Sequence, residues 1–372
     1  MNLRYLIIVL VILLIASFCT SKKSDSLKDA FKDKYLIGTA LTDYQIKGND
    51  PKSLQTAGEQ FDVITPENVL KWEKVHPAPG IYNFGPVDSL IEFCEKNNLA
   101  VIGHTLIWHH QTPEWVFKDK EGNQVSKDTL LKRIKEHIFT VVGKYKGRIH
   151  GWDVINEAFE DDGSFRNTLW RQIAGEDYLH KAFEWAHEAD PGAELYYNDY
   201  NMWYKGRRNA VVKMVNEFKT KNIPIHGIGL QGHWGLNYPT VDELNEVFEI
   251  YSKLDINVMV TELDLDMLPR PEDYEGADIS VNYEAKSVLN PWPDSLPDSM
   301  QTVVADRYAQ FFTIFNKYSS SVSRITLWGV HDGQSWRNYW PIHGRTAYPL
   351  LFDRNHQPKK AFFEVIKTAQ QK

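Results

Sequence analysis

Eight short apolar segments recur along this chain of 372 residues, and they limit its fold more than any other feature. Each is a nearly continuous run of apolar and β-branched residues, which is typical of a parallel strand buried on both faces. Helical patterns separate the runs, and eight alternations of strand and helix predict an α/β protein with a (β/α)₈ TIM barrel. The runs begin at Tyr35, Phe61, Leu99, Ile149, Ala193, Ile225, Ile256 and Ile325.

The segments between the runs support the same architecture. The clearest helical pattern covers residues 128–145, where Asp128 suits the N-terminal cap and Gly147 the stop. No linker interrupts residues 27–372, so we predict a single domain there. The interval 266–300 after the seventh run is rich in Pro, Asp and Ser, which predicts an extended loop. That loop either shapes one end of a cleft or packs as a surface excursion without function.

The N-terminus has the pattern of an export signal. Arg4 precedes an apolar run over residues 5–16, which is too short to span a bilayer. We interpret residues 1–19 as a signal peptide and residues 20–26 as a short polar linker. The signal resembles the bacterial lipoprotein type, in which Cys19 would be lipidated, and the alternative is ordinary secretion. The protein is thus predicted to be exported, and either secreted or lipid-anchored at the bacterial cell surface or outer membrane.

Composition and motifs exclude several classes of partner. The formal net charge of −7 argues against nucleic acid. No GxGxxG or Walker-type loop is present to bind phosphate, and no HxH or HExxH pair suggests a metal site, so we predict no cofactor and no metal. Without Cys19, the remaining thiol is Cys94, which leaves no intrachain disulfide. The sequence does not define the oligomeric state, for which a monomer is favoured.

Polar residues come last in each run, after the apolar ones. Because the carboxyl ends of barrel strands meet at one rim, we expect these residues to line one pocket. Amides and carboxylates bind hydroxyls and Trp packs on sugar rings, so the set favours a carbohydrate over the rival of metal hydrolysis. The residues are Glu67, Asn68, Lys71, His104, Trp108, His109, His110, Asn156, Glu157, the stretch 198–201, Gln231, His233, Trp234, Glu262, Asp264, Trp328, His331 and Asp332.

Two of these carboxylates, Glu157 and Glu262, end the fourth and seventh runs. Standard strand spacing in an eight-stranded barrel puts their Cα atoms roughly 14 Å apart across the mouth. Inward-pointing side chains then leave about 5–6 Å between the carboxyl groups, near the separation in a retaining glycosidase. A structural ion pair is the alternative. Asp153 lies deeper on the same strand, and we expect it to be a buried structural or electrostatic partner.

Six stretches in order resemble the motifs of glycoside hydrolase family 10, the endo-β-1,4-xylanases: TPENVLKW, GHTLIWH, WDVINEA, GLQGHW, VTELD and LWGVHDGQSW. The resemblance covers essentially the whole chain after the export segment. It implies retaining endo-hydrolysis of β-1,4-xylosidic linkages, with xylan or a xylo-oligosaccharide as substrate. The alternatives are a related retaining β-1,4-glycanase that acts on cellulose or mannan, and a non-catalytic glycan-binding barrel.

The resemblance also implies a role for each site residue. Glu157 would be the acid/base and Glu262 the nucleophile. Asn156 would hydrogen-bond the sugar 2-hydroxyl, and His233 would contact Glu262 and be oriented by Asp264. The other implied substrate contacts are Glu67, Asn68, Lys71, His104 and Gln231 at the glycone sugars, Trp108, Trp328 and Trp336 as a cage around the cleaved residue, and Tyr200 and Asn201 on the leaving-group side.

Overall fold

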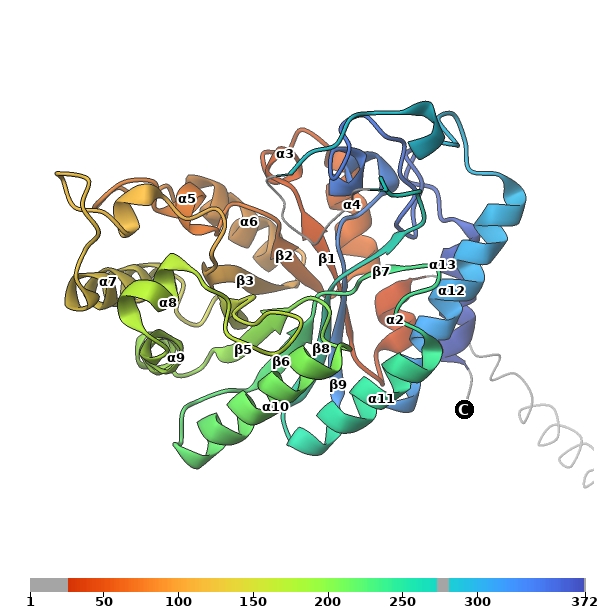
Figure 1. Cartoon of the computed structure of the whole chain (residues 1–372). Helices are drawn as coiled ribbons and strands as arrows, with labels where there is room; N and C mark the ends of the chain where they lie inside the picture. The colour runs from red at the N-terminus through yellow and green to blue at the C-terminus, as the bar shows by residue number, and fades with distance from the viewer. Residues whose placement is uncertain (1–25, 273–280, 371–372) are drawn as a thin grey trace, which may run out of the picture.

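The computed structural model describes residues 26–272 and 281–370, and within them a closed barrel of eight parallel strands forms the centre (Figure 1). Strands pair in sequence from β1 to β6, β6 pairs with β8, and β9 closes the ring between β8 and β1. The predicted (β/α)₈ barrel is therefore confirmed. Its strands are β1 (Leu36–Leu41), β2 (Val63–Pro66), β3 (Ala100–Ile107), β4 (Gly151–Asn156), β5 (Glu194–Asp199), β6 (Gly227–Leu230), β8 (Asn257–Asp266) and β9 (Val322–Leu327).

Helices surround the barrel and bury their apolar faces against the strands (Figure 1). Each helix in residues 26–272 and 281–370 is too short or too polar to cross a membrane. The predicted signal peptide, Cys19 and nearly all of the linker lie outside the described residues. The helices are α2 (Leu27–Phe31), α3 (Asp43–Ile46), α4 (Pro51–Gln60), α5 (Trp72–Val75), α6 (Gly85–Lys96), α7 (Lys127–Lys144), α8 (Leu169–Ala174), α9 (Asp177–Ala189), α10 (Lys205–Thr220), α11 (Val241–Tyr251), α12 (Asp298–Lys317) and α13 (Lys360–Ala369), with 3₁₀ turns η1 (Glu114–Val116), η2 (Ser252–Leu254), η3 (Ser287–Leu289), η4 (Asp332–Gln334) and η5 (Trp336–Asn338).

Helix α7 matches the predicted helix closely, but its cap differs. The side chain of Ser126, not Asp128, accepts a hydrogen bond from the backbone of Thr129. Asp128 instead lies in the first turn, where a negative charge interacts favourably with the helix dipole. Gly147 adopts φ +73° beyond the last turn, so it redirects the chain as expected.

The sixth predicted run divides into β6 and a short extra strand, β7 (His233–Gly235), which pairs with β8. Successive side chains of a strand point to opposite sides. His233 consequently faces the mouth of the barrel, whereas Trp234 is buried in the outer core with its ring 5.0 Å from that of Phe311. The prediction that Trp234 lies at the rim is therefore wrong.

The lower part of the barrel is filled by side chains. Val63, Ile102, Tyr196 and Met259 form a small cluster of their own, apart from the larger core between strands and helices. They come from β2, β3, β5 and β8, which places the cluster inside the barrel. This plug closes one end and leaves the carboxyl ends of the strands as the open end.

The predicted extended loop follows β8, and its described residues pack against the segment after β9. Tyr283 N–H donates to the carbonyl of Pro341 at 2.9 Å, and Tyr348 donates its hydroxyl proton to the carbonyl of Trp292 at 2.8 Å. Near the start of the loop, Arg270 lines the cavity described below. The start of the loop therefore reaches the cleft, as the first alternative predicted. Most of the described residues from 281 to 297 are exposed.

Candidate active site

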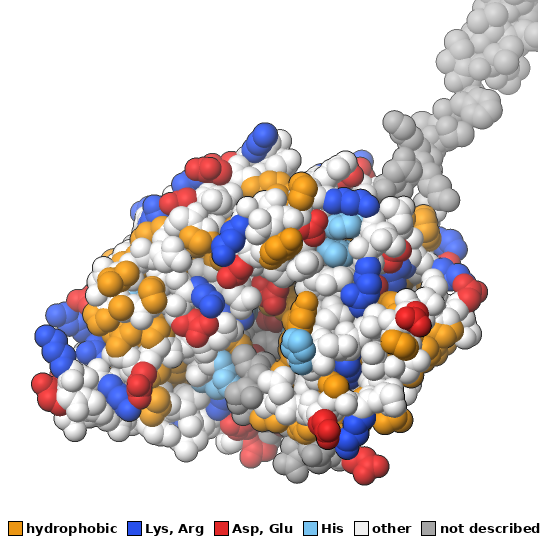
Figure 2. All heavy atoms as spheres, turned by 90° about the horizontal axis from the view of Figure 1, so that it is seen from above, with side chains coloured by type: hydrophobic (Ala, Val, Ile, Leu, Met, Phe, Trp, Pro, Cys, Tyr) orange, Lys and Arg blue, Asp and Glu red, His pale blue; other side chains and the backbone are white. Residues whose placement is uncertain are grey.

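A cavity of about 680 Å³ opens at the carboxyl end of the barrel. Seen from above in Figure 2, the molecule is hollowed near its centre, and acidic side chains gather there. The structure brings nearly all the predicted site residues together in this cavity. Those that line it are Glu67, Asn68, Lys71, His104, Trp108, Asn156, Glu157, Tyr200, Asn201, Gln231, His233, Glu262, Trp328 and Trp336.

Glu262 lies inside β8 and is held at both carboxylate oxygens. Asn198 donates its side-chain N–H to Oε1 at 2.8 Å, and His233 Nε2 lies 3.1 Å from Oε2. The other nitrogen of His233, Nδ1, lies 2.9 Å from Asp264 Oδ1. Asp264 in turn accepts hydrogen bonds from Arg337 and from the indole of Trp336, both at 2.7 Å. A chain of charged contacts therefore fixes the carboxylate from behind.

The charges in this chain alternate in sign. Burial alone would raise the pKa of Asp264, but the positive charges of Arg337 and His233 lower it to about 2. Burial would lower the pKa of His233, but Asp264 and Glu262 raise it to about 9. At neutral pH, His233 is therefore a cation between two carboxylates. A positively charged group is thus in direct contact with the Glu262 carboxylate.

Glu157 lies one residue beyond β4, in a different setting. Its backbone adopts φ +60°, a region that side chains with a Cβ rarely occupy and that is often found at functional sites. Trp108 donates its indole N–H to Oε2 at 2.8 Å, and Gln231 donates its amide to Oε1 at 2.8 Å. Burial would raise the pKa of Glu157, but the charge of His109 and these two hydrogen bonds lower it overall.

Asn198 connects the two carboxylates; the sequence placed the stretch 198–201 at the rim but assigned Asn198 no role of its own. Its backbone carbonyl accepts from Glu157 N–H at 2.9 Å, while its side chain donates to Glu262 and, at 3.0 Å, to Asn156 Oδ1. A Cβ on Gly229 would lie 2.4 Å from Asn198 Oδ1, so only glycine leaves room for this amide. The available signal was an uncharged amide inside an apolar strand run, where a hydrophobic residue is usual.

Lys71 forms the floor of one side of the cavity. Its ammonium donates to Asn68 Oδ1 at 3.1 Å and lies 4.8 Å from the centre of the Trp108 ring. Desolvation raises the pKa of neighbouring Glu67 to about 7, although the charge of Lys71 opposes that shift. This side of the cavity thus offers both hydrogen-bond donors and hydrogen-bond acceptors to the hydroxyl groups of a ligand.

His104 is fixed from below by Asp153, whose Oδ2 lies 2.8 Å from His104 Nδ1. Asp153 is buried, so its predicted role as a buried partner is confirmed. The ring of His104 meets that of Trp328 edge-on, with centroids 5.5 Å apart. This contact joins the polar floor of the cavity to the tryptophan side chains Trp328, Trp336 and Trp340, which we call the aromatic wall.

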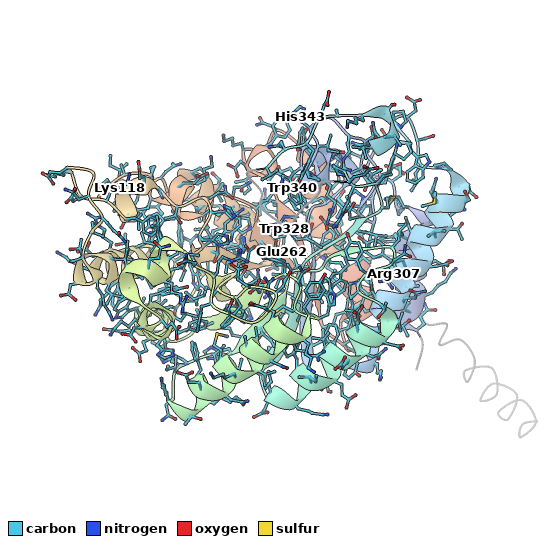
Figure 3. All side chains as sticks on the ribbon, viewed as in Figure 1. Lys118, Glu262, Arg307, Trp328, Trp340 and His343 are labelled. Carbon is cyan, nitrogen blue, oxygen red and sulfur yellow. The ribbon has the colours of Figure 1, made fainter. Side chains whose placement is uncertain are left out.

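The aromatic wall stands above Glu262. Figure 3 shows Trp328 and Trp340 in the centre of the molecule, close to Glu262 in this view. The rings of Trp336 and Trp340 stack with centroids 4.9 Å apart. Trp340, Gln111, Asp161, Trp203 and Arg337 also line the cavity and were not predicted, because they lie on loops whose path the strand pattern does not define.

A second cavity of about 500 Å³ lies on the far side of Glu157. It shares Glu157, Asp161 and Tyr200 with the first cavity, so the two cavities adjoin at these residues. The other lining residues are His109, His110, Phe117, Glu160, Arg166, Asn167, Thr168, Leu169 and Trp170. The carboxylate of Glu157 thus stands between two spaces, which suits a group that acts on a bond joining two sugars.

Two polar residues of the last run do not reach either cavity, so their predicted place at the rim is wrong. Gly329 adopts φ +131° and turns the chain just after the strand. His331 is consequently buried elsewhere, and Asp332 accepts a hydrogen bond from Lys359 at 2.9 Å.

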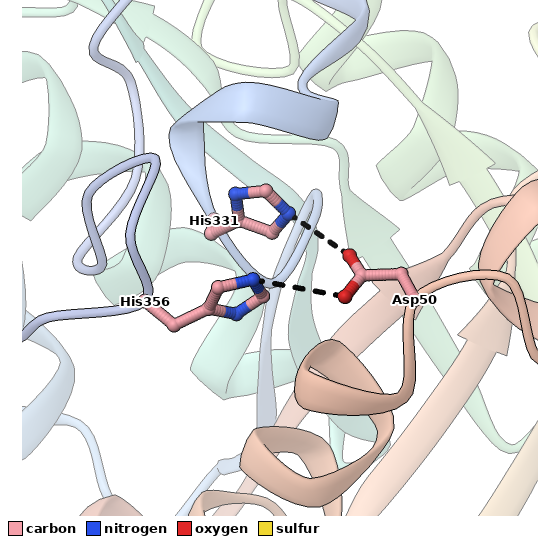
Figure 4. A group of neighbouring side chains, drawn as sticks. All are labelled: Asp50, His331 and His356. Atoms are coloured by element: carbon pink, nitrogen blue, oxygen red, sulfur yellow. Dashed lines mark hydrogen bonds and ion pairs between the residues drawn. The ribbon is translucent and has the colours of Figure 1, made fainter.

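Within the described residues, Asp50, His331 and His356 form a group close enough to share a metal ion (Figure 4). His331 Nε2 lies 3.2 Å from Asp50 Oδ2, and Gly333 N–H donates to His331 Nδ1 at 3.2 Å. Because Nδ1 accepts that bond, neutral His331 carries its proton on Nε2 and donates it to Asp50. Asp50 also caps α4 by accepting from Ser53 N–H at 3.1 Å. This hydrogen bonding favours a structural link over a metal site.

Comparison with known proteins agrees with this geometry. The model of the family "Glycosyl hydrolase family 10" matches residues 26–368. The chain is 41% identical over 356 residues to "Endo-1,4-beta-xylanase A" of Xylanibacter ruminicola, with 96% of each chain covered. It is 40% identical over 378 residues to "Beta-1,4-xylanase" of Dictyoglomus thermophilum, which covers 98% of this chain and 99% of the relative.

Solved structures give the same result. A GH10 endoxylanase from a sugarcane soil metagenome superimposes with a TM-score of 0.88 at 40% identity, covering 93% of this chain and 100% of the other. Xylanase 10B from Thermotoga petrophila RKU-1, in complex with xylobiose, has a TM-score of 0.80 at 32% identity over 94% of this chain and 98% of the other. The chain belongs to glycosyl hydrolase family 10.

Proposed function

We propose that this protein is a retaining endo-β-1,4-xylanase, with residues 27–372 as its catalytic domain. The observation that carries the proposal is a pair of carboxylates in one cavity, Glu157 just beyond β4 and Glu262 within β8. Glu157 and Glu262 are joined through the amides of Gln231, Asn156 and Asn198, with contacts between 2.8 and 3.3 Å. The relatives named as xylanases, matched over nearly their whole length, supply the substrate class.

The two carboxylates would act in two steps. In the first, Glu262 attacks the anomeric carbon while Glu157 gives its proton to the leaving glycosidic oxygen, so one C–O bond forms as the other breaks. In the second, Glu157 takes a proton from water, which attacks the same carbon and releases Glu262. The cationic setting of Glu262 supports the role of nucleophile, because that residue must be ionised before attack.

The neighbouring residues support sugar binding. Asn156 contacts Glu157 directly and is linked to Glu262 through Asn198, and it would offer its amide to the sugar 2-hydroxyl. Glu67, Asn68, Lys71, His104 and Gln231 would bind the other glycone hydroxyls, Trp108, Trp328 and Trp336 would enclose the cleaved residue, and Tyr200 and Asn201 would contact the leaving sugar. Xylose lacks a C6 hydroxymethyl group, so a close aromatic wall selects xylan over glucans and mannans.

Substrate choice and stereochemistry test the proposal together. We expect initial hydrolysis rates on xylan to exceed those on carboxymethylcellulose and mannan by at least about tenfold, the discrimination a packed pocket gives against an added group. Proton NMR of the first products should show the β-anomer. A comparable rate on cellulose or mannan would assign a different glycanase, and an α-anomer as first product would exclude a retaining mechanism. Binding of xylan without turnover would assign a glycan-binding protein.

We further propose export through residues 1–19, with Cys19 as the lipidated first residue of the mature chain and the catalytic domain a monomer. Mass spectrometry of the mature N-terminus from a bacterial host tests the anchor. A diacylglyceryl modification on Cys19 is expected, and an unmodified N-terminus would indicate plain secretion. Sedimentation of the domain tests the monomer.

A further inference from the structure

The loop after Glu157 folds back as a hairpin and returns Arg166 to the start of the loop. Glu160 N–H donates to the carbonyl of Ser164 at 2.8 Å, and Arg166 N–H donates to the carbonyl of Ala158 at 2.8 Å. Phe159 and the residue opposite it, Phe165, form an antiparallel bridge. The hairpin thereby places the Arg166 side chain under the backbone of Glu157.

Arg166 binds the backbone at the point where the catalytic side chain leaves it. Its Nε donates to the carbonyl of Glu157 at 3.1 Å, and its Nη2 donates to the carbonyl of Phe159 at 3.3 Å and to the hydroxyl of Tyr200 at 2.8 Å. The side chain is only 17% exposed. A rigid guanidinium can make these contacts at once, whereas a lysine ammonium on a flexible stem makes them less well.

Arg166 holds the strained backbone of Glu157. At φ +60°, Glu157 needs surrounding contacts to stay in place. Its N–H is fixed on one side by the carbonyl of Asn198, and its own carbonyl is fixed on the other side by Arg166. Release of one side would let the peptide rotate and carry the carboxyl group away from the bond to be cleaved.

We propose that Arg166 is a positioning residue for the acid/base step, holding the carboxyl of Glu157 between the two cavities. This inference rests on the proposed function, because it takes Glu157 as the acid/base. The competing explanation is that Arg166 only ties the hairpin together, through these bonds and its ion pair with Glu160 at 3.3 Å. The two explanations differ in how the effect of a substitution depends on the leaving group.

Aryl β-xylobiosides provide the discriminating substrates. A 2,4-dinitrophenolate leaves without a proton, whereas phenol needs one from the general acid. Loss of acid positioning therefore lowers kcat/KM for the phenyl substrate and spares it for the dinitrophenyl substrate. A hairpin that merely loosens the binding site lowers both alike.

The variants are Arg166→Gln and Arg166→Lys, with Glu157→Ala as the reference and Arg171→Gln as the matched control. Arg171 lies on α8, is 40% exposed, pairs with Glu176 and does not line either cavity. Its guanidinium carbon lies 5.6 Å from the centre of the Phe165 ring, so this control also reports on loss of packing against the hairpin. For Arg166→Gln we expect kcat/KM on the phenyl substrate to fall about tenfold to 100-fold and that on the dinitrophenyl substrate to change less than about threefold. The loss is smaller than the full contribution of acid–base catalysis, about 10²–10⁴-fold, because the acid is displaced and not removed. For Arg166→Lys we expect a smaller loss of kcat/KM that is again larger on the phenyl than on the dinitrophenyl substrate. If Arg166→Gln does not fold, Arg166→Lys is used for the test.

A second readout is the split between kcat and KM on the dinitrophenyl substrate. Its kcat depends on the second step, in which Glu157 acts as base, so kcat and KM should fall together in the Arg166 variants. Equal losses of kcat/KM on both substrates would overturn the inference in favour of a hairpin tether. If Glu157→Ala itself shows no dependence on the leaving group, the acid/base assignment fails. If Glu157→Ala shows it and neither Arg166 variant does, only the role of Arg166 fails.

Discussion

The two carboxylates of the cleft are held by different parts of the fold. Glu262 belongs to the interior of β8, and it contacts Asn198 of β5 and His233 of β7. Glu157 stands just beyond β4 at a left-handed φ, and its contacts include Trp108 from a loop. The difference follows their proposed chemistry, because a nucleophile must stay ionised and fixed, whereas an acid/base must gain and lose a proton.

The hydrogen bonds to Glu157 sharpen this contrast. Donors reach both of its oxygens, and its pKa is lowered overall against the effect of burial. The ionised form suits the base step. For the acid step, a proton must occupy one of the remaining lone pairs on these oxygens.

Removal of the proposed nucleophile should give the largest effect. Glu262→Ala deletes the carboxylate that, in our proposal, forms the covalent intermediate, so turnover of xylan should fall by at least about 10⁴-fold. Azide, small enough to occupy the space left, should restore turnover of an activated aryl xyloside and yield the α-azide of inverted configuration. Recovery of activity without azide, or a β-azide product, would mean that Glu262 is not the nucleophile.

Asp264→Asn tests whether the fixed setting of Glu262 depends on the charge behind it. The variant keeps the shape but removes the anion that holds His233 protonated, and we expect kcat/KM to fall about 100-fold, as for other residues that orient a catalytic group. Asp177→Asn is the control, since that carboxylate is 61% exposed and pairs only with a surface lysine. Unchanged activity in Asp264→Asn would show that the hydrogen bond, not the charge, fixes His233.

The same variant should change how the stability of the fold depends on pH. The pKa of His233 is raised from 6.5 to about 9 on folding, so protonated His233 contributes stability that is fully present below pH 6.5 and lost as pH rises through 9. The melting temperature of the wild type should fall over this window. In Asp264→Asn, the fall should be smaller or absent. An equal fall in the melting temperatures of the wild type and of Asp264→Asn would mean that another titratable group causes it.

The sequence predicted the fold because eight apolar runs leave few other ways to bury them. It also predicted the two glutamates and most of the polar lining, because residues at strand ends must meet at one rim. It failed where a single backbone angle redirects the chain, as at Gly329, which takes His331 and Asp332 away from the cleft. It placed Asn198 at the rim but did not predict its role, because that role depends on residues of two neighbouring strands.

Asn198→Ala tests the connection between the two carboxylates. The variant deletes the donor to Glu262 but keeps the backbone carbonyl that binds Glu157 N–H. A hydrogen bond to a charged group contributes about 1.5–3 kcal/mol, so kcat/KM should fall about tenfold to 100-fold. The loss should be equal for phenyl and dinitrophenyl xylobiosides, because the nucleophile serves both. An effect confined to the phenyl substrate would place Asn198 with the acid instead. Asn245→Ala, at a half-buried position of α11 that lines neither cavity, is the control.

Trp108→Phe should give the smallest change in rate and the clearest change in pH dependence. It removes the indole donor to Glu157 Oε2 and leaves an aromatic ring beside Lys71. Without that donor the ionised form loses stabilisation, so the pKa of Glu157 rises. A general acid must be protonated, so the alkaline limb of kcat/KM should move to higher pH, while the rate at the optimum changes less than about threefold.

The control for this profile is Trp185→Phe, on α9 and remote from both cavities. A limb that stays in place in Trp108→Phe would mean that Gln231 and the charge of His109 suffice to hold Glu157 ionised. An alkaline limb that moves to lower pH would mean that the indole of Trp108 stabilises the protonated carboxyl of Glu157. The contacts of Glu157 would then fix one protonation state, as the contacts of Glu262 are proposed to do. The contrast between the two carboxylates therefore depends on the direction of this one shift.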